Sequence, residues 1–257
     1  MKKMYLFGLI ALVLMTTTSC MSVNFGNGDK DTTPTQVPTA SQQTTMNPFD
    51  CVKIGGAFKV IYEQGDNYSV RIDASEQAIK EMTVYVKDET LYIRKAVSKP
   101  TVSFKNVKIY VTSPVIEDIE IAGSGLFTAS QPITAQDLDT EIAGSGQILL
   151  TAVSSKDTHI EIAGSGRTEI GQLITETVEA EIAGSGDINL GSMTCKDFKI
   201  EIAGSGNVNC DNIDADDVHT EIAGSGNVNL KGTVRHHTKE IAGSGKVNIT
   251  SPNDTIN

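Results

Sequence analysis

The stretch KIEIAGSGNVNC at residues 199–210 decides the fold of this chain, because its central hexapeptide EIAGSG occurs seven times. The copies begin at Glu120, Glu141, Glu161, Glu181, Glu201, Glu221 and Glu240, so that successive copies are 19 to 21 residues apart. A short repeat with a constant period predicts a solenoid, in which each coil buries its apolar side only against neighbouring coils.

The pattern inside one repeat is that of β-strands. Phe198, Ile200 and Ile202 alternate with Lys199 and Glu201, a period of two, and the following Gly-Ser-Gly ends the strand at a tight corner. A second alternation follows the corner in each coil, and a third apolar site lies beyond it, as at Val153, Leu173, Met193 and Ile213. We therefore predict an all-β fold, a right-handed parallel β-helix with coils of about 20 residues, each with two strands and a shorter third side.

Stacked coils place equivalent residues in columns. The isoleucines of the repeat point inward, and the seven glutamates form an outward column in which neighbours about 5 Å apart repel by about 1 kcal/mol in water. Two residues earlier we place a mixed column, whose later members are expected to offset this repulsion: Asp118, Asp139, His159, Glu179, Lys199, His219 and Lys239. A strand face presents carboxylates in a line and not in a cage, so we predict a solvated face, no metal ion and no cofactor; the alternative is a Ca²⁺ site.

Residues 47–119 are β-rich but not repetitive. Strands are expected at residues 57–62, 68–72, 84–86 and 91–93, with a turn at Asp88-Glu89 and a short helix within residues 75–82. The repeats at 120–257 carry 20 acidic against 8 basic residues, whereas residues 20–119 carry 12 against 11. Nine of the ten aromatic residues after Met46 lie between Phe49 and Phe127, and interfaces favour Tyr, Phe and Arg, so we expect any recognition there.

The N-terminus predicts an export signal. Lys2 and Lys3 precede a short apolar run, small polar residues and then Cys20, and this run is too short to span a membrane. The order resembles the lipobox of bacterial lipoproteins, which implies a signal peptide at residues 1–19 and a lipid anchor on Cys20. The polar residues 20–46 predict a disordered tether. Met21 after the Cys resembles release to the outer membrane, with the surface and the periplasmic faces both open.

Four features are similar to a known family: Ile54-Gly55-Gly56-Ala57-Phe58-Lys59-Val60, Leu91-Tyr92-Ile93, the run at residues 107–111 and the repeated Gly-Ser-Gly. Together they resemble the head GIN domain family over about residues 47 to 250. Its members are described as "putative auto-transporter adhesins", often lipoproteins with a β-helical fold. The resemblance implies surface attachment and a glycan or protein ligand, and it carries no binding residues over to this chain.

Several other chemistries are excluded or disfavoured by the sequence. The net charge of −11 argues against nucleic acid, and Gly-Ser-Gly lacks the helix and Lys that a phosphate loop needs. We expect Cys210 to be a buried thiol that is not bridged to Cys195, leave the state of Cys51 open, and expect a structural or incidental role for His236-His237. The leading interpretation is a non-enzymatic envelope lipoprotein that binds a surface ligand. The alternatives are a periplasm-facing structural scaffold without a ligand and, less favoured, a β-helical polysaccharide-active enzyme.

Overall fold

The computed structural model describes residues 44–96, 104 and 107–251, and every structural statement below concerns these residues. They form one helix, α1 (Glu76–Lys80), and nineteen strands. The strands before the repeats are β1 Thr44–Thr45, β2 Cys51–Gly55, β3 Lys59–Gln64, β4 Ser69–Asp73, β5 Met82–Lys87, β6 Thr90–Lys95 and β7 Lys108–Ser113. Those of the repeats are β8 Asp118–Gly123, β9 Leu126–Ala129, β10 Ile133–Thr134, β11 Asp137–Gly144, β12 Gln147–Ser154, β13 Asp157–Gly164, β14 Arg167–Ile174, β15 Thr177–Gly184, β16 Asp187–Gly204, β17 Asn207–Gly224, β18 Asn227–Gly243 and β19 Lys246–Thr250.

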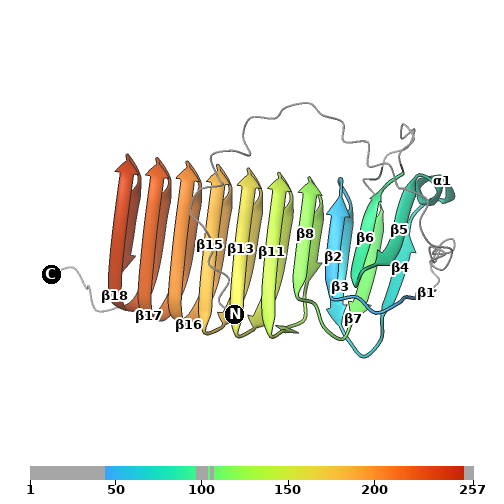
Figure 1. The fold of residues 1–257 in the computed structure, drawn as a ribbon, viewed down its shortest axis with the longest axis horizontal. Coiled ribbons are helices and arrows are strands. Elements are labelled where there is room, and N and C mark those ends of the chain that lie inside the picture. The colour runs from blue at the N-terminus through green and yellow to red at the C-terminus, as the bar shows by residue number, and fades with distance from the viewer. Residues whose placement is uncertain (1–43, 97–103, 105–106, 252–257) are drawn as a thin grey trace. The chain divides into compact units, whose positions relative to one another are not determined.

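The repeats form a parallel β-solenoid, as the sequence predicts. Each strand pairs with its equivalent one coil away, so that Glu141 lies opposite Glu161 and Ile142 opposite Ile162. Figure 1 shows the coils stacked side by side in a horizontal row from β8 to β18. In the later coils the third side is also paired, which makes β16, β17 and β18 continuous around most of a coil.

The Gly-Ser-Gly corner explains why the repeat tolerates no other residue at its glycines. The first glycine has a positive φ, 133° at Gly184, which side-chain-bearing residues rarely adopt. A Cβ on Gly184 would also lie 2.4 Å from the carbonyl oxygen of Gly164 in the preceding coil. A Cβ on the second glycine, Gly186, would lie 2.5 Å from the side chain of Ile162. Close stacking of the coils therefore requires both glycines.

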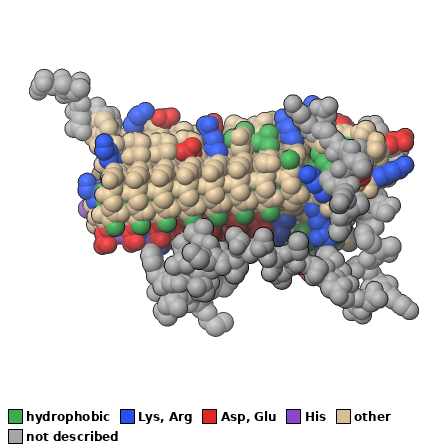
Figure 2. Space-filling model, turned by 90° about the horizontal axis from the view of Figure 1, so that it is seen from above, with side chains coloured by type: hydrophobic (Ala, Val, Ile, Leu, Met, Phe, Trp, Pro, Cys, Tyr) green, Lys and Arg blue, Asp and Glu red, His purple; other side chains and the backbone are tan. Residues whose placement is uncertain are grey.

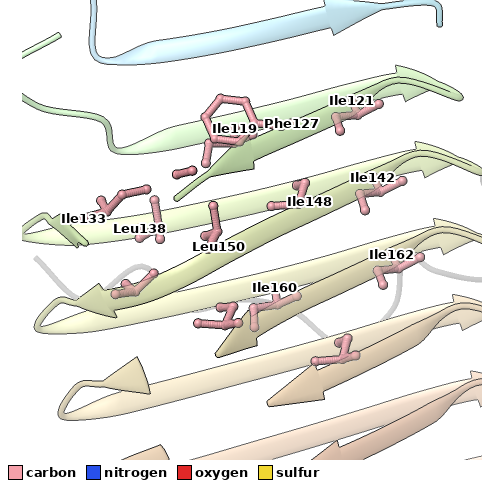
Figure 3. Packing of buried hydrophobic residues seen from close by; sticks show 14 of the residues in the cluster. Ile119, Ile121, Phe127, Ile133, Leu138, Ile142, Ile148, Leu150, Ile160 and Ile162 are labelled. Carbon is pink, nitrogen blue, oxygen red and sulfur yellow. The ribbon is translucent and has the colours of Figure 1, made fainter. Parts of the chain in front are cut away.

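The core is the space between the strands of each coil. Inward side chains of successive coils meet there, and the close-up shows them lying between the ribbons before and after the corner (Figure 3). The expected third inward site is confirmed, since Val153, Leu173, Met193 and Ile213 are all buried. Burying this much Ile, Leu and Val is the main stabilising contribution, about 1.5–3 kcal/mol for each fully buried side chain.

The last coil is one residue shorter than the others, and this corrects one position of the expected columns. Gly232, with a φ of 132°, lies opposite Ile213. One residue separates Leu230 from Gly232, whereas two separate the equivalent Cys210 and Ile213 of the preceding coil. Thr238, which lies two residues before Glu240, and not Lys239, lies opposite His219 in the mixed column. Lys239 lies opposite the buried Thr220, at an inward position of the last coil.

The non-repetitive strands continue the stack in a different chain order. β2 lies between β8 and β6, and β3 lies between β9 and β7, all in parallel register. Antiparallel β5 and β4 then pair with β6 and β7, and β1 pairs with β4 (Figure 1). The expected strands, the helix and the Asp88-Glu89 turn are confirmed, the helix beginning after a Ser75 cap.

Residues 44–46, at the end of the segment that the sequence assigns to the tether, are part of the folded domain. Thr44 and Thr45, which the sequence assigns to the tether, pair with β4, and the backbone N–H of Met46 donates to the carbonyl of Tyr68. The physical reason is Met46 itself, whose large apolar side chain is buried. Cys20 and the remainder of the expected signal peptide and tether lie outside the described residues.

Candidate functional site

One continuous outward surface collects most of the charged side chains that the sequence analysis singles out. We call it the ladder face and define it by the outward residues of the strands that precede the glycine corner. Its first column is the glutamates from Glu120 to Glu240, and its second column is Asp118, Asp139, His159, Glu179, Lys199, His219 and Thr238. Figure 2 shows a row of acidic side chains along one edge of the coils, beside a flat band of small side chains and backbone.

Cations in the second column bridge carboxylates of neighbouring coils. The Nζ of Lys199 lies 2.6 Å from Glu179 and 2.5 Å from Glu201. The His219 ring hydrogen-bonds Glu221 of its own strand at 2.9 Å, and its other nitrogen lies 2.7 Å from the Thr238 hydroxyl of the next coil. The expected offset of the glutamate repulsion is therefore present in the later coils, and it is produced by side chains that reach both along a strand and across to the next coil.

His159 is the cation of the middle coils. Its ring nitrogens lie 4.0 Å from a carboxylate oxygen of Glu161 and 3.8 Å from one of Glu179. These facing carboxylates raise the pKa of His159 to about 10, and His159 in turn lowers the pKa of Glu179 to about 2. The histidine is thus charged at neutral pH and belongs to the ion-pair ladder.

The first coils have no such cation in the second column. Burial, and then the charge of Glu120, raises the pKa of Asp118 to about 6. Burial is also the larger cause of the raised pKa of Glu141, ahead of its neighbours Glu120 and Glu161. This matches the expectation that the early acidic members cannot relieve the repulsion. Lys53 of β2, paired with Glu120, is the cation nearest to that end of the glutamate column.

One group of side chains has the composition of a metal site. Ligand atoms of His159, Glu179 and Glu181 all lie within 4.8 Å of one another. The proton on His159 occupies the nitrogen that a metal would use, and the carboxylate of Glu179 already faces both His159 and Lys199. The arrangement is satisfied as an ion-pair cluster, and the absence of a metal stays a prediction.

The ladder face ends, on the side of the non-repetitive strands, in an aromatic and cationic surface. Tyr85 of β5 lies opposite Tyr92 of β6, and their rings are stacked with centroids 5.0 Å apart and planes inclined by 13°. The guanidinium of Arg94 lies 5.1 Å from the centroid of the Tyr85 ring. Lys53 lies opposite Tyr92 on the other side. We call Lys53, Tyr85, Tyr92 and Arg94 the aromatic platform; both of its rings are partly exposed.

The sequence analysis places recognition between Phe49 and Phe127 but does not single out these residues. A signal was present, because a two-residue turn at Asp88-Glu89 places residues 85 and 92 opposite each other in the hairpin. Most other aromatic side chains of this part are buried, including Phe49, Phe58, Tyr62 and Phe127. The two tyrosines of the platform therefore belong to the minority of aromatic side chains in this part that are partly exposed and not in the core.

The described cysteines are free thiols. Cys210 is buried opposite Leu190 and Leu230, as predicted, and Cys195 lies opposite Ala215 at another point of the coil. Burial raises the pKa of Cys195 to about 12 and that of Cys210 to about 11. Cys51 lies beside Asp118, and burial raises its pKa to about 12. None of these three thiols is therefore an activated nucleophile.

Other candidate groups are accounted for by stacking and ion pairs. The Asn column forms an amide ladder, with each side-chain N–H donating to the preceding amide oxygen at 2.9 to 3.0 Å through Asn189, Asn209, Asn229 and Asn248. Arg167 pairs with Glu169 in its own strand, and Arg235 pairs with Asp214 and Asp216. His236 lies 3.3 Å from Asp217.

Hollows on the described surface include two that differ in their lining. One of about 450 Å³ is lined by Thr45, Asp66, Asn67, Tyr68 and Ser69. The other, of about 320 Å³, lies over the last coils and is lined by Asp197, Phe198, Lys199, Asp217, Val218, His219, His236 and Thr238. The first has no Lys or Arg in its lining, and the second combines two aspartates, Lys199 and two histidines without an Arg. Among the described residues, no helix has the length and hydropathy needed to cross a membrane.

The comparison with protein families agrees with this geometry. The family model described as "Putative auto-transporter adhesin, head GIN domain" matches residues 48–208 and again residues 190–251. The chain belongs to this family. The two overlapping matches together cover the non-repetitive strands and the repeats. No curated protein matches the chain.

Solved structures share the fold of this head GIN domain. A crystallised "putative adhesin" from Bacteroides fragilis NCTC 9343 matches with a TM-score of 0.75 and 21% identity, over 81% of this chain and 95% of its own. One from Parabacteroides merdae ATCC 43184 matches with a TM-score of 0.70 and 21% identity, over 81% and 94%. A "putative lipid binding protein" from Parabacteroides distasonis ATCC 8503 matches with a TM-score of 0.66 and 25% identity, over 81% and 95%.

Proposed function

We propose that this protein is a non-enzymatic lipoprotein of the bacterial envelope, held in the outer membrane by a lipid on Cys20, whose head GIN domain binds a glycan or protein on a surface. Membership of a family described as adhesins supports the binding role. The charged start, short apolar run and small residues before Cys20 support the anchor.

The observation that carries the binding role is the aromatic platform. Tyr and Arg are enriched at recognition surfaces, and stacked tyrosines present a rigid apolar area with polar edges at low entropic cost. The platform combines two such rings with Arg94 and Lys53 on a regular sheet. Neighbouring strands hold the rings in place, so a ligand meets a preorganised surface.

The same geometry disfavours an enzyme. General acid–base or nucleophilic chemistry needs a poised pair of groups in a cleft. Here the outward carboxylates repeat along the coils, the described thiols are held protonated, and Arg167 and Arg235 are engaged with neighbouring acids. A structural scaffold without a ligand remains the competing function, favoured by the regularity of the ladder face.

Binding is tested with ring-removing and ring-preserving variants. Purified protein is applied to an array of neutral and anionic glycans and to immobilised matrix proteins. Tyr85→Ala with Tyr92→Ala should abolish retained binding, whereas Tyr85→Phe with Tyr92→Phe should keep most of it because the stacked rings remain. Deletion of residues 161–220, three whole periods, should also keep binding. If a folded deletion variant loses binding while the Tyr85→Ala, Tyr92→Ala variant keeps it, recognition lies on the repeats instead.

The face of the membrane is tested by adding protease to intact cells. An adhesive role predicts that the head domain is lost from intact cells, with a periplasmic protein in the same sample untouched. If the domain is degraded only after the outer membrane is opened, the periplasm-facing scaffold is the correct assignment.

A further inference from the structure

The two ends of the stack are finished in different ways. At the end formed by the non-repetitive strands, the outermost strands are antiparallel β5 and β1, and α1 lies just before β5 in the chain (Figure 1). At the other end, the part of β18 after Gly232 pairs only with β17, and β19 pairs only with β18, within the described residues. This last coil therefore presents unpaired strand edges, the kind of surface that adds a further strand.

The last coil is also where the inward columns change character. Inward residues of the preceding coil, Val218, Thr220 and Ile222, are all buried. Their equivalents are His237, Lys239 and Ile241, so a polar ring and an ammonium group take the places of Val and Thr. Lys239 is exposed, and no carboxylate lies within ion-pair distance of it among the described residues.

The remaining inward residues of the same coil are apolar. Ile241 is 38% exposed, and Val234, Val247 and Ile249 are partly exposed where their equivalents in earlier coils are buried. A second coil placed against this edge would cover these side chains and pair the free backbone groups. It would also bury the ammonium of Lys239 between two sheets without a counter-charge, which is strongly unfavourable.

We propose that His237 and Lys239 protect the last coil from pairing with a second copy of this chain, so that the stack ends at this coil and the protein stays monomeric. The partner is a second copy because its last coil offers the same unpaired strands and the same apolar residues. The opposite end of a neighbouring molecule also has unpaired edges, on β5 and β1, but these are antiparallel strands of six and two residues and do not repeat the coil. Two identical edges meet by a two-fold axis, which gives a closed dimer and not a fibre.

The test restores the residues of the preceding coil. His237→Val with Lys239→Thr is made in the full chain carrying Cys20→Ser, so that no lipid drives association, and mass is measured by sedimentation over a wide range of concentration. The double variant should double in mass as concentration rises, whereas the parent chain stays monomeric. Lys246→Thr is the matched control, since Lys246 is an outward cation of the same coil; it should stay monomeric.

Two further variants locate the contact. Adding Ile241→Lys to the double variant places a new charge at an inward position of the same edge and should return it to a monomer. Lys239→Thr alone is a smaller change and replaces the double variant if that one folds poorly. It should give a weaker dimer. The proposal is overturned if the folded double and single variants stay monomeric, if the parent chain is already dimeric, or if Lys246→Thr dimerises equally. It is also overturned if ending the chain after Ser251 is enough to cause dimerisation.

Discussion

Replacing a single corner glycine should destabilise the protein more than removing most side chains from its surface. Gly184 has a φ of 133°, and a Cβ built there would lie 2.4 Å from the Gly164 carbonyl oxygen, where contacts under 3.0 Å essentially never occur. The backbone conformation alone costs an alanine about 1–3 kcal/mol. Moving the preceding coil away adds about 1–3 kcal/mol, as for other overpacked sites. We therefore expect Gly184→Ala to lower the free energy of unfolding by about 2–6 kcal/mol.

Urea unfolding followed by far-ultraviolet circular dichroism measures this loss. With a slope of about 2 kcal/mol per molar urea, the midpoint should fall by about 1–3 M. Ser185→Ala is the matched control because Ser185 is exposed at the same corner, and it should change stability by less than about 0.5 kcal/mol. Gly123→Ala should cost less than Gly184→Ala, since its φ is similar, 124°, but its nearest atom is 3.2 Å away.

The outcomes separate the two causes. If Gly123→Ala and Gly184→Ala lose the same stability, the backbone angle alone explains the glycine and the close approach of coils is irrelevant. If Gly184→Ala is as stable as Ser185→Ala, the steric explanation of the repeat is wrong.

Four other predictions concern charge and anchoring. The pKa of His159 is raised to about 10, so its ion pairs should stabilise the fold fully below about pH 6.5. This contribution should be lost as the pH rises through about 10. His159→Gln should remove this pH dependence from thermal melting curves. Burial, and then Glu201, raises the pKa of Glu181, so Glu181→Gln should stabilise slightly at neutral pH and lose its advantage in acid; Glu201→Gln should destabilise because Glu201 pairs with Lys199. For a solvated face, Ca²⁺ should raise the melting temperature no more than NaCl of equal ionic strength, and a Ca²⁺-specific rise lost in Glu181→Gln would establish a metal site. Cys20→Ser should move the protein from the membrane fraction to the soluble fraction, and an unchanged fraction would place the anchor elsewhere.

The sequence was sufficient for the repeats because one period carries all the needed information. Alternation around Glu201 defines a strand, Gly204 and Gly206 define the corner, and the constant spacing defines the register between coils. The position of Lys239 was predicted wrongly, although the position of Glu240 in the last repeat already places Thr238, two residues before it, in the mixed column. The sequence shows that the last coil is short, but only the structure shows that the missing residue belongs to the third side, beside Gly232.

The non-repetitive part was predictable as elements but not as an arrangement. Ile54-Gly55-Gly56 takes the same place in its coil as Ile121-Ala122-Gly123, and Gly56 has the same kind of positive φ. However, β2 is inserted between β8 and β6, which are remote in the chain, and only three-dimensional packing decides that order. For the ladder face the sequence predicted that later members of the second column offset the glutamate repulsion, but not the individual ion pairs, because these depend on which neighbouring carboxylate a long side chain reaches.

The regularity of the repeats also limits what they can recognise. Stacking accounts for the isoleucines and glycines of EIAGSG, whereas the glutamates lie on the outward face, most of them in similar surroundings. A column that repeats at every coil offers a ligand several equivalent positions along the stack, so it cannot by itself define one bound register. The stacked pair of Tyr85 and Tyr92 beside Arg94 is not repeated along the stack, at the point where the column of glutamates gives way to Lys53. The second column varies from coil to coil, so it is the glutamates alone that lack a register. The irregular end adds two partly exposed rings beside Arg94 and Lys53, and this favours it as the place where a ligand would bind in a single orientation. The acidic column adds a long-range field that disfavours anions along the rest of the stack.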